Sequence, residues 1–432
     1  MDFVRNMFKK LKSLLLSGLS YIIFGNFLSK AVALLSSILI ARFVDKSEYA
    51  YLSYADNLYQ YVVLFTGLGL ANALLVVCKS DVSLGKQHNY LRKAIKYGGA
   101  VEFFASLILC ILVMVITIPF PDARKYMWLL VLYPFCTYVF NALQAYIRVK
   151  RNNKLYAALG AAQTLIVCTL SVILVLFLDA VGVVFSRYIA AITVLIIAAA
   201  YIFKTDGKVK IEPLEKGEHR KYFSIGISLM FTSFFSGIMP LNEAFIVNHL
   251  IKDEVVTANF KVAGIIPSLL IIITSSVMIY YFPIIVGMKD GKEIKKKVVR
   301  IALINGVIIC ALTAMGMLLT PFGIGFVYGK KYLDAVGISY SLWIMRCVDA
   351  AIRMVPSNIL AAVGEAKFNA YVSVITCLIH AVLDYVFIRM WQVNGIAYAA
   401  IISYIISAIV MWIHFFRTCN NISKGSLKVL EE

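Results

Sequence analysis

Charged side chains are scarce in this chain: Asp, Glu, Lys and Arg make up 15% of its 432 residues, against 61% hydrophobic residues. A soluble domain carries about 25% charged residues. The mean hydropathy of +0.84 therefore excludes a soluble globular class and indicates a membrane protein with many spans.

Signatures of enzyme and metal chemistry are also missing. The eight cysteines are scattered without paired spacing, which indicates neither a disulfide framework nor a zinc site. No two aspartates lie within three residues of each other, so the acidic metal motif of many sugar-nucleotide enzymes is not there. Gly329 and Lys330 suggest a phosphate-binding loop, but Ile324 stands where its first glycine would be needed. We expect no enzyme, no metal and no cofactor.

Apolar runs of about 20 residues, the length at which a helix crosses a bilayer, are abundant. They predict an all-α polytopic membrane protein with about twelve transmembrane helices. The predicted spans are residues 17–41, 51–77, 98–118, 127–147, 156–178, 182–203, 222–248, 256–286, 298–319, 335–360, 369–388 and 395–416.

The two halves of the chain share the positions at which apolar runs begin and end. Three pairs of breakpoints lie 213 residues apart: Lys154 and Lys367, Gly182 and Gly395, and Lys204 and Arg417. Six runs per half predict a parallel internal repeat of two six-helix bundles, related by an axis along the membrane normal. Such repeats are common in secondary transporters, with the substrate path between the halves.

The repeat and the charged segments divide the chain into five parts. These are a cytoplasmic amphipathic N-terminus (1–16), an N-terminal six-helix bundle (17–203), a cytoplasmic linker (204–221), a C-terminal six-helix bundle (222–416) and a cytoplasmic tail (417–432). Basic residues before an apolar run also fit a cleaved secretory signal, but the first run continues through Ile40 and is better interpreted as a span.

Lysine and arginine predict the orientation. With the N-terminus inside, 29 of the 42 basic residues fall in inner segments and 10 at outer ends. This positive-inside bias places both termini in the cytoplasm. It also accounts for most of the net charge of +19, so no nucleic-acid partner is expected.

Polar and ionisable residues inside the spans are the candidate site. A charge at a helix centre costs roughly 2.5–3.5 kcal/mol, so such residues should face the bundle interior or a wet cavity. The candidates for binding an anionic substrate are Asn26, Lys30, Lys261, Arg346 and Arg353. The candidates for ion coupling or for internal pairing are Asp56, Glu102, Glu243, Asp349 and Asp384.

Two interpretations of these residues stay open. The four cations could present a positive wall to a central cavity that attracts phosphate or pyrophosphate. Alternatively the charges neutralise one another in pairs, Arg346 with Asp349 and Lys30 with Asp56, and hold helices in register. The sequence does not separate the two.

Three short stretches resemble a known family. Residues 38–54 (ILIARFVDKSEYAYLSY), 258–263 (ANFKVA) and 322–336 (FGIGFVYGKKYLDAV) are similar to segments of the O-antigen and capsule repeat-unit flippases, which belong to the multidrug, oligosaccharidyl-lipid and polysaccharide exporter superfamily. Ala50 and Phe260 depart from the family's usual glycine and tyrosine. Lys261 matches a position that is commonly basic in the family.

The resemblance implies a bacterial cytoplasmic-membrane flippase, with two six-helix bundles around a cationic cavity. It would move an undecaprenyl-pyrophosphate-linked oligosaccharide to the outer leaflet by alternating access. The implied partners are that lipid-linked substrate, membrane lipids, H+ or Na+ as the coupling ion, and a polysaccharide polymerase. Two other functions remain: a drug or cation antiporter of the same superfamily, and a membrane polysaccharide polymerase, which the short outer loops disfavour.

Overall fold

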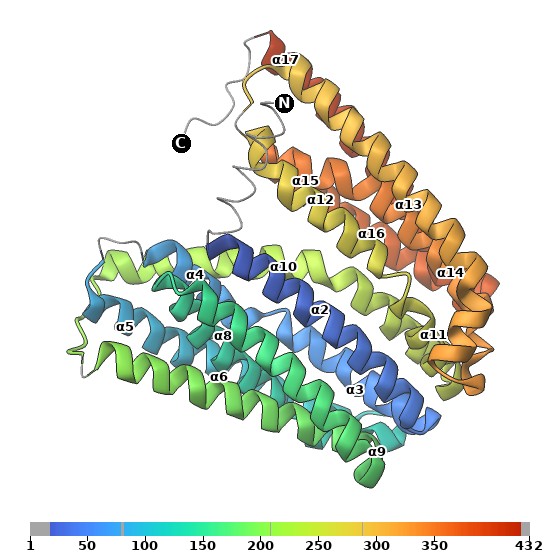
Figure 1. The fold of residues 1–432 in the computed structure, drawn as a ribbon, viewed down its shortest axis with the longest axis horizontal. Coiled ribbons are helices and arrows are strands. Elements are labelled where there is room, and N and C mark those ends of the chain that lie inside the picture. Colours follow the sequence, from blue (N-terminus) through green and yellow to red (C-terminus); the bar gives the residue numbers. More distant parts are fainter. Residues whose placement is uncertain (1–17, 79–81, 208, 287, 425–432) are drawn as a thin grey trace, which may run out of the picture. The chain divides into compact units, whose positions relative to one another are not determined.

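The computed structural model describes residues 18–78, 82–207, 209–286 and 288–424, and every element in these ranges is helical (Figure 1). The chain forms two compact units, of which the first ends at Phe234 and the second begins at Phe235. This boundary lies inside α10, whose first turns pack within unit 1.

Unit 1 is built around the long helix α9, along which α2 and α8 lie (Figure 1). Its elements are α2 (Gly18–Phe43), α3 (Lys46–Val63), η1 (Thr66–Gly69), α4 (Leu70–Val77), α5 (Leu84–Lys93), η2 (Ala94–Gly98), α6 (Gly99–Val115), η3 (Pro121–Ala123), α7 (Arg124–Leu130), α8 (Tyr133–Val149), α9 (Asn153–Asp206) and the first part of α10 (Lys216–Ile251).

In unit 2, α14 packs against α11, α13 and α17, and α16 packs along α17. Besides the rest of α10, its elements are α11 (Glu254–Ile265), α12 (Leu269–Val286), α13 (Gly291–Val327), η4 (Lys330–Tyr332), α14 (Ala335–Val348), η5 (Asp349–Arg353), α15 (Met354–Ala362), α16 (Ala366–Trp391) and α17 (Val393–Ser423). Both η2 and η5 are single π-helical turns inside longer helical rods.

Several helices begin where a polar side chain caps the first turn. Carboxylate oxygens of Asp45, Asp253 and Asp290 accept hydrogen bonds from backbone N–H groups one or two residues into the following helix. The amide oxygen of Asn152 does the same for the N–H of Leu155 at 3.1 Å. Such caps satisfy N–H groups that a helix leaves without a partner, so they fix where each apolar rod begins.

Among the described residues, nine helices are long and apolar enough to cross a membrane, and ten if the two parts of the bent α10 form one further span. The all-α membrane fold is confirmed, while the count of twelve spans stays a prediction. One of the nine is α9, whose 54 residues contain a backbone break at Asp179, where the sequence places the end of one predicted span and the start of the next.

The break in α9 has a counterpart at the start of α17. Asp179 has φ +48° and ψ −140°, and Gln392 has φ +49° and ψ −138°. The two residues are 213 positions apart, the offset found in the apolar runs. The same turn is thus built twice, with residues other than glycine in a region of φ that side chains rarely adopt.

Glycines three residues after each turn allow the returning helix to pack closely. A methyl group added to Gly182 would lie 2.5 Å from the carbonyl group of Leu174. One added to Gly395 would lie 2.2 Å from the carbonyl oxygen of Phe387. In both cases the contact is with the residue eight positions earlier, so the two glycine breakpoints of the sequence share one structural role.

The rod that contains α3 and α4 is broken in its middle. Thr66–Gly69 all have positive φ, between +44° and +67°. A methyl group on Gly69 would lie 2.1 Å from the carbonyl oxygen of Gly226, so the break and α10 approach backbone to backbone. The hydroxyl of Tyr222 donates to the carbonyl oxygen of Leu70 at 2.9 Å, which satisfies one backbone group next to the break.

The distribution of side chains is that of a membrane protein. Large apolar side chains lie on the outside, as in Phe177 (79% exposed) and Leu318 (82% exposed). Ionisable side chains lie inside, as in Glu102 (1% exposed) and Asp384 (fully buried). This arrangement agrees with helices whose outer faces contact lipid and whose polar groups are kept from it.

Candidate functional site

A cluster of charged and polar side chains lies inside unit 2. It is formed by α10, α14, η5, α16 and α17, all of which belong in this region to rods of membrane-spanning length. We call it the charged cluster, and its members are Glu243, Arg346, Asp349, Arg353, His380, Asp384 and Tyr404.

Glu243 lies at the centre of the charged cluster and is 2% exposed. Its Oε2 atom is 3.6 Å from Nη2 of Arg346, and its Oε1 atom is 4.0 Å from Nε2 of His380. The hydroxyl of Tyr404 donates a hydrogen bond to Oε1 at 3.4 Å. One carboxylate from α10 thus contacts three other helices of the unit.

Asp349 and Arg353 form the second ion pair of the cluster. Nε of Arg353 donates to Oδ1 of Asp349 at 2.7 Å, and the guanidinium lies 4.6 Å from the centre of the Tyr404 ring. Arg346, the other candidate partner of Asp349, lies 3.6 Å from Glu243. Both partners of the observed pair lie in the π-helical turn η5, four residues apart, a spacing at which side chains on a helix are neighbours.

The third carboxylate, Asp384, is buried without full hydrogen bonding. Nδ1 of His380 is 3.3 Å from Oδ2 of Asp384, but neither carboxylate oxygen has a hydrogen-bond partner in the described part of the chain. Nε of Arg346 also lacks a partner there. Unsatisfied buried polar groups are costly and rare, so these atoms are places where a proton, an ion or water is needed.

The charges of the cluster decide what it can bind. With three carboxylates ionised, two guanidinium groups charged and His380 neutral, the net charge is −1. Each proton taken up by a carboxylate raises this charge by one, and a proton on Glu243 or Asp349 also releases a guanidinium from its partner. Arg346 and Arg353 keep 18% and 20% of their side-chain surface exposed, so they remain accessible to an anion. A change in the protonation of the carboxylates therefore changes whether the cluster attracts a cation or an anion.

In unit 1, Asp56 forms a bidentate ion pair with Arg187. Nη1 donates to Oδ1 at 2.5 Å and Nη2 donates to Oδ2 at 2.8 Å, a fork geometry that arginine makes with carboxylates. The pair ties α3 to the second part of α9. Arg187 is the residue that the structure shows beside Asp56, and the predicted partner Lys30 has a side chain outside what the structure describes.

Glu102 lies apart from both ion pairs. Its Oε1 atom accepts a hydrogen bond from the backbone N–H of Gly67 at 2.7 Å, and its Oε2 atom has no partner among the described residues. The carboxylate is thus held at the break between α3 and α4.

Of the three other predicted anion contacts, Lys261 is the one whose side chain the structure describes. Asn26 and Lys30 lie on α2, but their side chains are outside what the structure describes. Lys261 is exposed on α11 and makes no ion pair with any described residue. Of the candidate cations, Arg346 and Arg353 are therefore the ones that the structure brings together.

Sequence reasoning missed two members of these sites. Arg187 is not among the predicted site residues, although its position inside the apolar run 182–203 is a signal that it needs a partner. Tyr404 gave no signal, because nothing in the last apolar run distinguishes it from its neighbours. Its role depends on contacts with Glu243 and Arg353, which are distant in sequence.

Comparisons with known proteins agree with this architecture. A family model described as "Polysaccharide biosynthesis protein" matches residues 15–289, well over half of the chain. A putative O-antigen transporter from Shigella flexneri is 23% identical over 240 residues. That alignment covers 55% of this chain and 56% of the relative, so the chain matches little more than half of the relative's length.

Solved transporter structures share the fold. An inward closed conformation of the lipid II flippase MurJ superposes with a TM-score of 0.67 at 13% identity, covering 94% of this chain and 90% of that one. An inward-facing MATE-family multidrug resistance transporter gives 0.66 at 15% identity, with 92% and 96% coverage. A MOP superfamily transporter from Pyrococcus furiosus gives 0.61 at 14% identity, with 94% and 96% coverage.

Identities this low establish the fold alone, whereas the family match reaches across the first half and into the second. The chain is a multi-pass membrane protein with the fold of the MOP superfamily transporters, and it belongs to the polysaccharide biosynthesis protein family.

Proposed function

We propose that the chain is a flippase that moves an undecaprenyl-pyrophosphate-linked oligosaccharide from the inner to the outer leaflet of a bacterial cytoplasmic membrane. Family membership and the likeness to a putative O-antigen transporter support a polysaccharide-related transporter. Both termini would lie in the cytoplasm, and a polysaccharide polymerase would take up the flipped product. The proposal involves no covalent chemistry.

The observation that carries the proposal is the pair of arginines in the charged cluster whose side chains are about one-fifth exposed. A pyrophosphate needs cationic hydrogen-bond donors to leave water, and guanidinium groups bind phosphate oxygens in a bidentate manner. Arg346 and Arg353 are held inside the membrane-spanning part of unit 2 by carboxylates. Asn26, Lys30 and Lys261 are proposed as additional contacts to the head group.

The same carboxylates supply a coupling step. Protonation of Glu243 or Asp349 would release an arginine for the pyrophosphate, and deprotonation would restore the ion pair and expel it. Uptake and release of H+ would in this way alternate with binding and release of the lipid anion. Na+ bound at Asp384 would act on the same charge balance.

The test is flipping of a fluorescent undecaprenyl-pyrophosphate-linked oligosaccharide in proteoliposomes. Hydrogen bonds to charged groups contribute about 1.5–3 kcal/mol, so Arg346→Gln and Arg353→Gln should each slow flipping about ten- to hundredfold. Arg389→Gln is the matched control, because Arg389 is an exposed arginine on α16 whose contact is with Tyr385. Equal rates in all three variants at equal folding would contradict the proposed role of the cluster.

A drug or cation antiporter is the second candidate, and one observation favours it. The cluster contains more carboxylates than guanidinium groups, and Asp384 has two unpartnered oxygens. An organic cation would be bound by such a site and exchanged for protons. Asp384→Asn distinguishes the two: it should abolish export of a cation, while a flippase would keep binding its lipid anion and lose only the ion dependence.

A further inference from the structure

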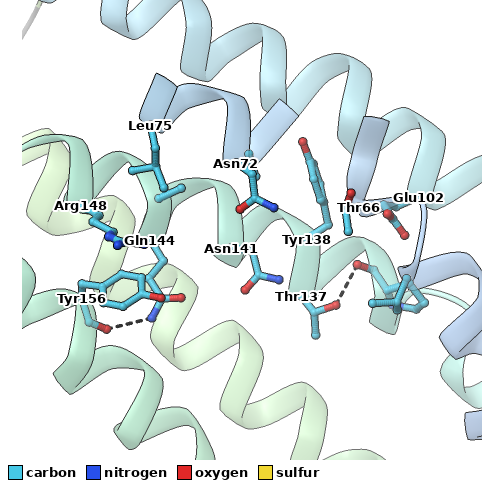
Figure 2. A pocket seen from close by; sticks show the side chains of 14 residues that line it. Thr66, Asn72, Leu75, Glu102, Thr137, Tyr138, Asn141, Gln144, Arg148 and Tyr156 are labelled. Atoms are coloured by element: carbon cyan, nitrogen blue, oxygen red, sulfur yellow. Dashed lines mark hydrogen bonds between the residues drawn. The ribbon is translucent and has the colours of Figure 1, made fainter. Parts of the chain in front are cut away.

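A polar groove in unit 1 has a volume of about 180 Å³ and is separate from the charged cluster (Figure 2). It runs between α8 on one side and the broken rod of α3, η1 and α4 on the other. Figure 2 shows Asn72 and Asn141 facing each other across it, with Glu102 towards one end and Arg148 towards the other.

One face of α8 supplies the floor of the groove. Its polar residues are Thr137, Asn141, Gln144 and Arg148, at positions i, i+4, i+7 and i+11. This spacing places them in one row along the helix, about 16 Å long at the rise of an α-helix. Four polar side chains in a row are unusual in a rod that is apolar enough to cross a membrane.

The break between α3 and α4 forms part of the opposite wall of the groove. Because the chain turns through Thr66–Gly69, the hydroxyl of Thr66 reaches the groove beside the carboxylate of Glu102. Both side chains end in a buried oxygen, Thr66 Oγ1 and Glu102 Oε2, that has no hydrogen-bond partner in the described part of the chain. Glu102 is 1% exposed, so this is an unpartnered carboxylate oxygen directed into a cavity.

Of the other polar groups, Gln144 donates to the carbonyl oxygen of Tyr156 at 2.9 Å and Thr137 donates to backbone carbonyls of its own helix, whereas Asn72, Asn141 and Arg148 differ. Asn72 and Asn141 are exposed, and neither amide hydrogen-bonds to another described residue. Arg148 lies 5.5 Å from the centre of the Tyr156 ring and forms no ion pair within the described ranges. An amide moved from water into hydrocarbon without a partner costs roughly 2–7 kcal/mol, so lipid chains are excluded as the occupant. The groove holds water or a polar ligand.

We propose that this groove binds one sugar residue of the lipid-linked oligosaccharide, an inference that rests on the proposed function. Sugar hydroxyls both donate and accept hydrogen bonds, as the facing amides of Asn72 and Asn141 require. The carboxylate of Glu102 accepts from hydroxyls, and Arg148 donates to hydroxyl or acidic substituents. The C–H faces of a pyranose ring match the apolar side chain of Leu75 on the same wall.

The composition of the groove disfavours an organic cation as its ligand. A cation would contact Glu102 but would meet the guanidinium of Arg148 and donor amide groups elsewhere. The aromatic rings of Tyr138 and Tyr156 also line the groove and suit the C–H faces of a sugar ring. A sugar can hydrogen-bond to the amides of Asn72 and Asn141 and needs no net charge.

The first experiment tests whether the groove is wet. Asn141→Cys should react with a membrane-impermeant, charged methanethiosulfonate reagent in open membranes, because thiolates form in water. Leu112→Cys is the matched control, since Leu112 is 51% exposed on α6 and faces outwards as an apolar side chain. Labelling counted by peptide mass spectrometry should be at least tenfold faster at position 141. Equal slow labelling at both positions would overturn the proposal.

The second experiment identifies the occupant. An undecaprenyl-pyrophosphate-linked oligosaccharide should protect Cys at position 141 from the reagent, and undecaprenyl pyrophosphate without sugar should not. Equal protection by both lipids would assign the groove to the carrier and overturn the sugar site. Protection by neither, with flipping intact, would remove the sugar site and leave the proposed function standing. Protection by the lipid-linked oligosaccharide without any flipping would support the sugar site and contradict the proposed function.

Discussion

Replacing Arg187 by glutamine is expected to destabilise unit 1, because Asp56 would lose both of its hydrogen-bond donors. The two bonds measure 2.5 and 2.8 Å. Removing one partner of a fully buried pair costs about 3–5 kcal/mol. Here the side chains of Arg187 and Asp56 are 18% and 26% exposed. Partial screening by water lowers the expected loss in the free energy of unfolding to about 2–3 kcal/mol.

The assay is a double-mutant cycle on the native chain, Asp56→Asn, Arg187→Gln and the double variant. The free energy of unfolding is measured by titration with a denaturing detergent. If the residues act as a pair, the double variant should regain most of the stability lost in Arg187→Gln, with a coupling energy of about 2 kcal/mol. It should also flip lipid-linked oligosaccharide at the native rate. Additive losses of stability, or loss of flipping in a stable double variant, would refute a purely structural role for Asp56.

Three further predictions concern single positions. Gly69→Ala should lower the free energy of unfolding by about 2–5 kcal/mol, because φ at this position is +67° and the new methyl group would meet a backbone carbonyl. Gly217→Ala is the control, since a methyl group there meets nothing, and equal midpoints of thermal unfolding for the two variants would contradict the prediction. Glu102→Gln should fold normally, since its amide oxygen can still accept the hydrogen bond from the backbone N–H of Gly67. Glu102→Ala should lower the free energy of unfolding by about 1–3 kcal/mol, and equal stabilities of the two variants would contradict this role of the carboxyl oxygen. Gln392→Gly should raise the free energy of unfolding by about 1 kcal/mol by relieving its positive φ, and a decrease would contradict the observed turn.

The sequence predicted the fold class because membrane spans are local features. Apolar runs and their polar breaks require no knowledge of tertiary contacts, and the offset of 213 residues reappears in the backbone angles of Asp179 and Gln392. The break at Thr66–Gly69 was not predicted. It lies inside an apolar run, and its two glycines are explained only by tertiary contacts, that of Gly67 with the ring of Tyr138 on α8 and that of Gly69 with the backbone of α10.

The candidate site could be predicted in its residues but not in its pairing. A charged residue in an apolar run stands out because placing it there costs free energy, and for this reason Glu243, Arg346 and Asp384 were predicted as site residues. The contacts of Glu243 depend on how helices from different parts of the chain pack, whereas Asp349 and Arg353 are neighbours four residues apart on one helical rod. The polar row on α8 was present in the sequence as a spacing and was overlooked, because none of its middle members carries a charge.

The most direct measurement is transport by the purified native chain in proteoliposomes, with two substrates supplied in parallel. One is a fluorescent undecaprenyl-pyrophosphate-linked oligosaccharide and the other is a small fluorescent organic cation. The account predicts that the lipid-linked oligosaccharide crosses the bilayer faster than in protein-free vesicles and that the cation does not. Movement of the cation without movement of the lipid-linked oligosaccharide would contradict the flippase account and establish the antiporter in its place.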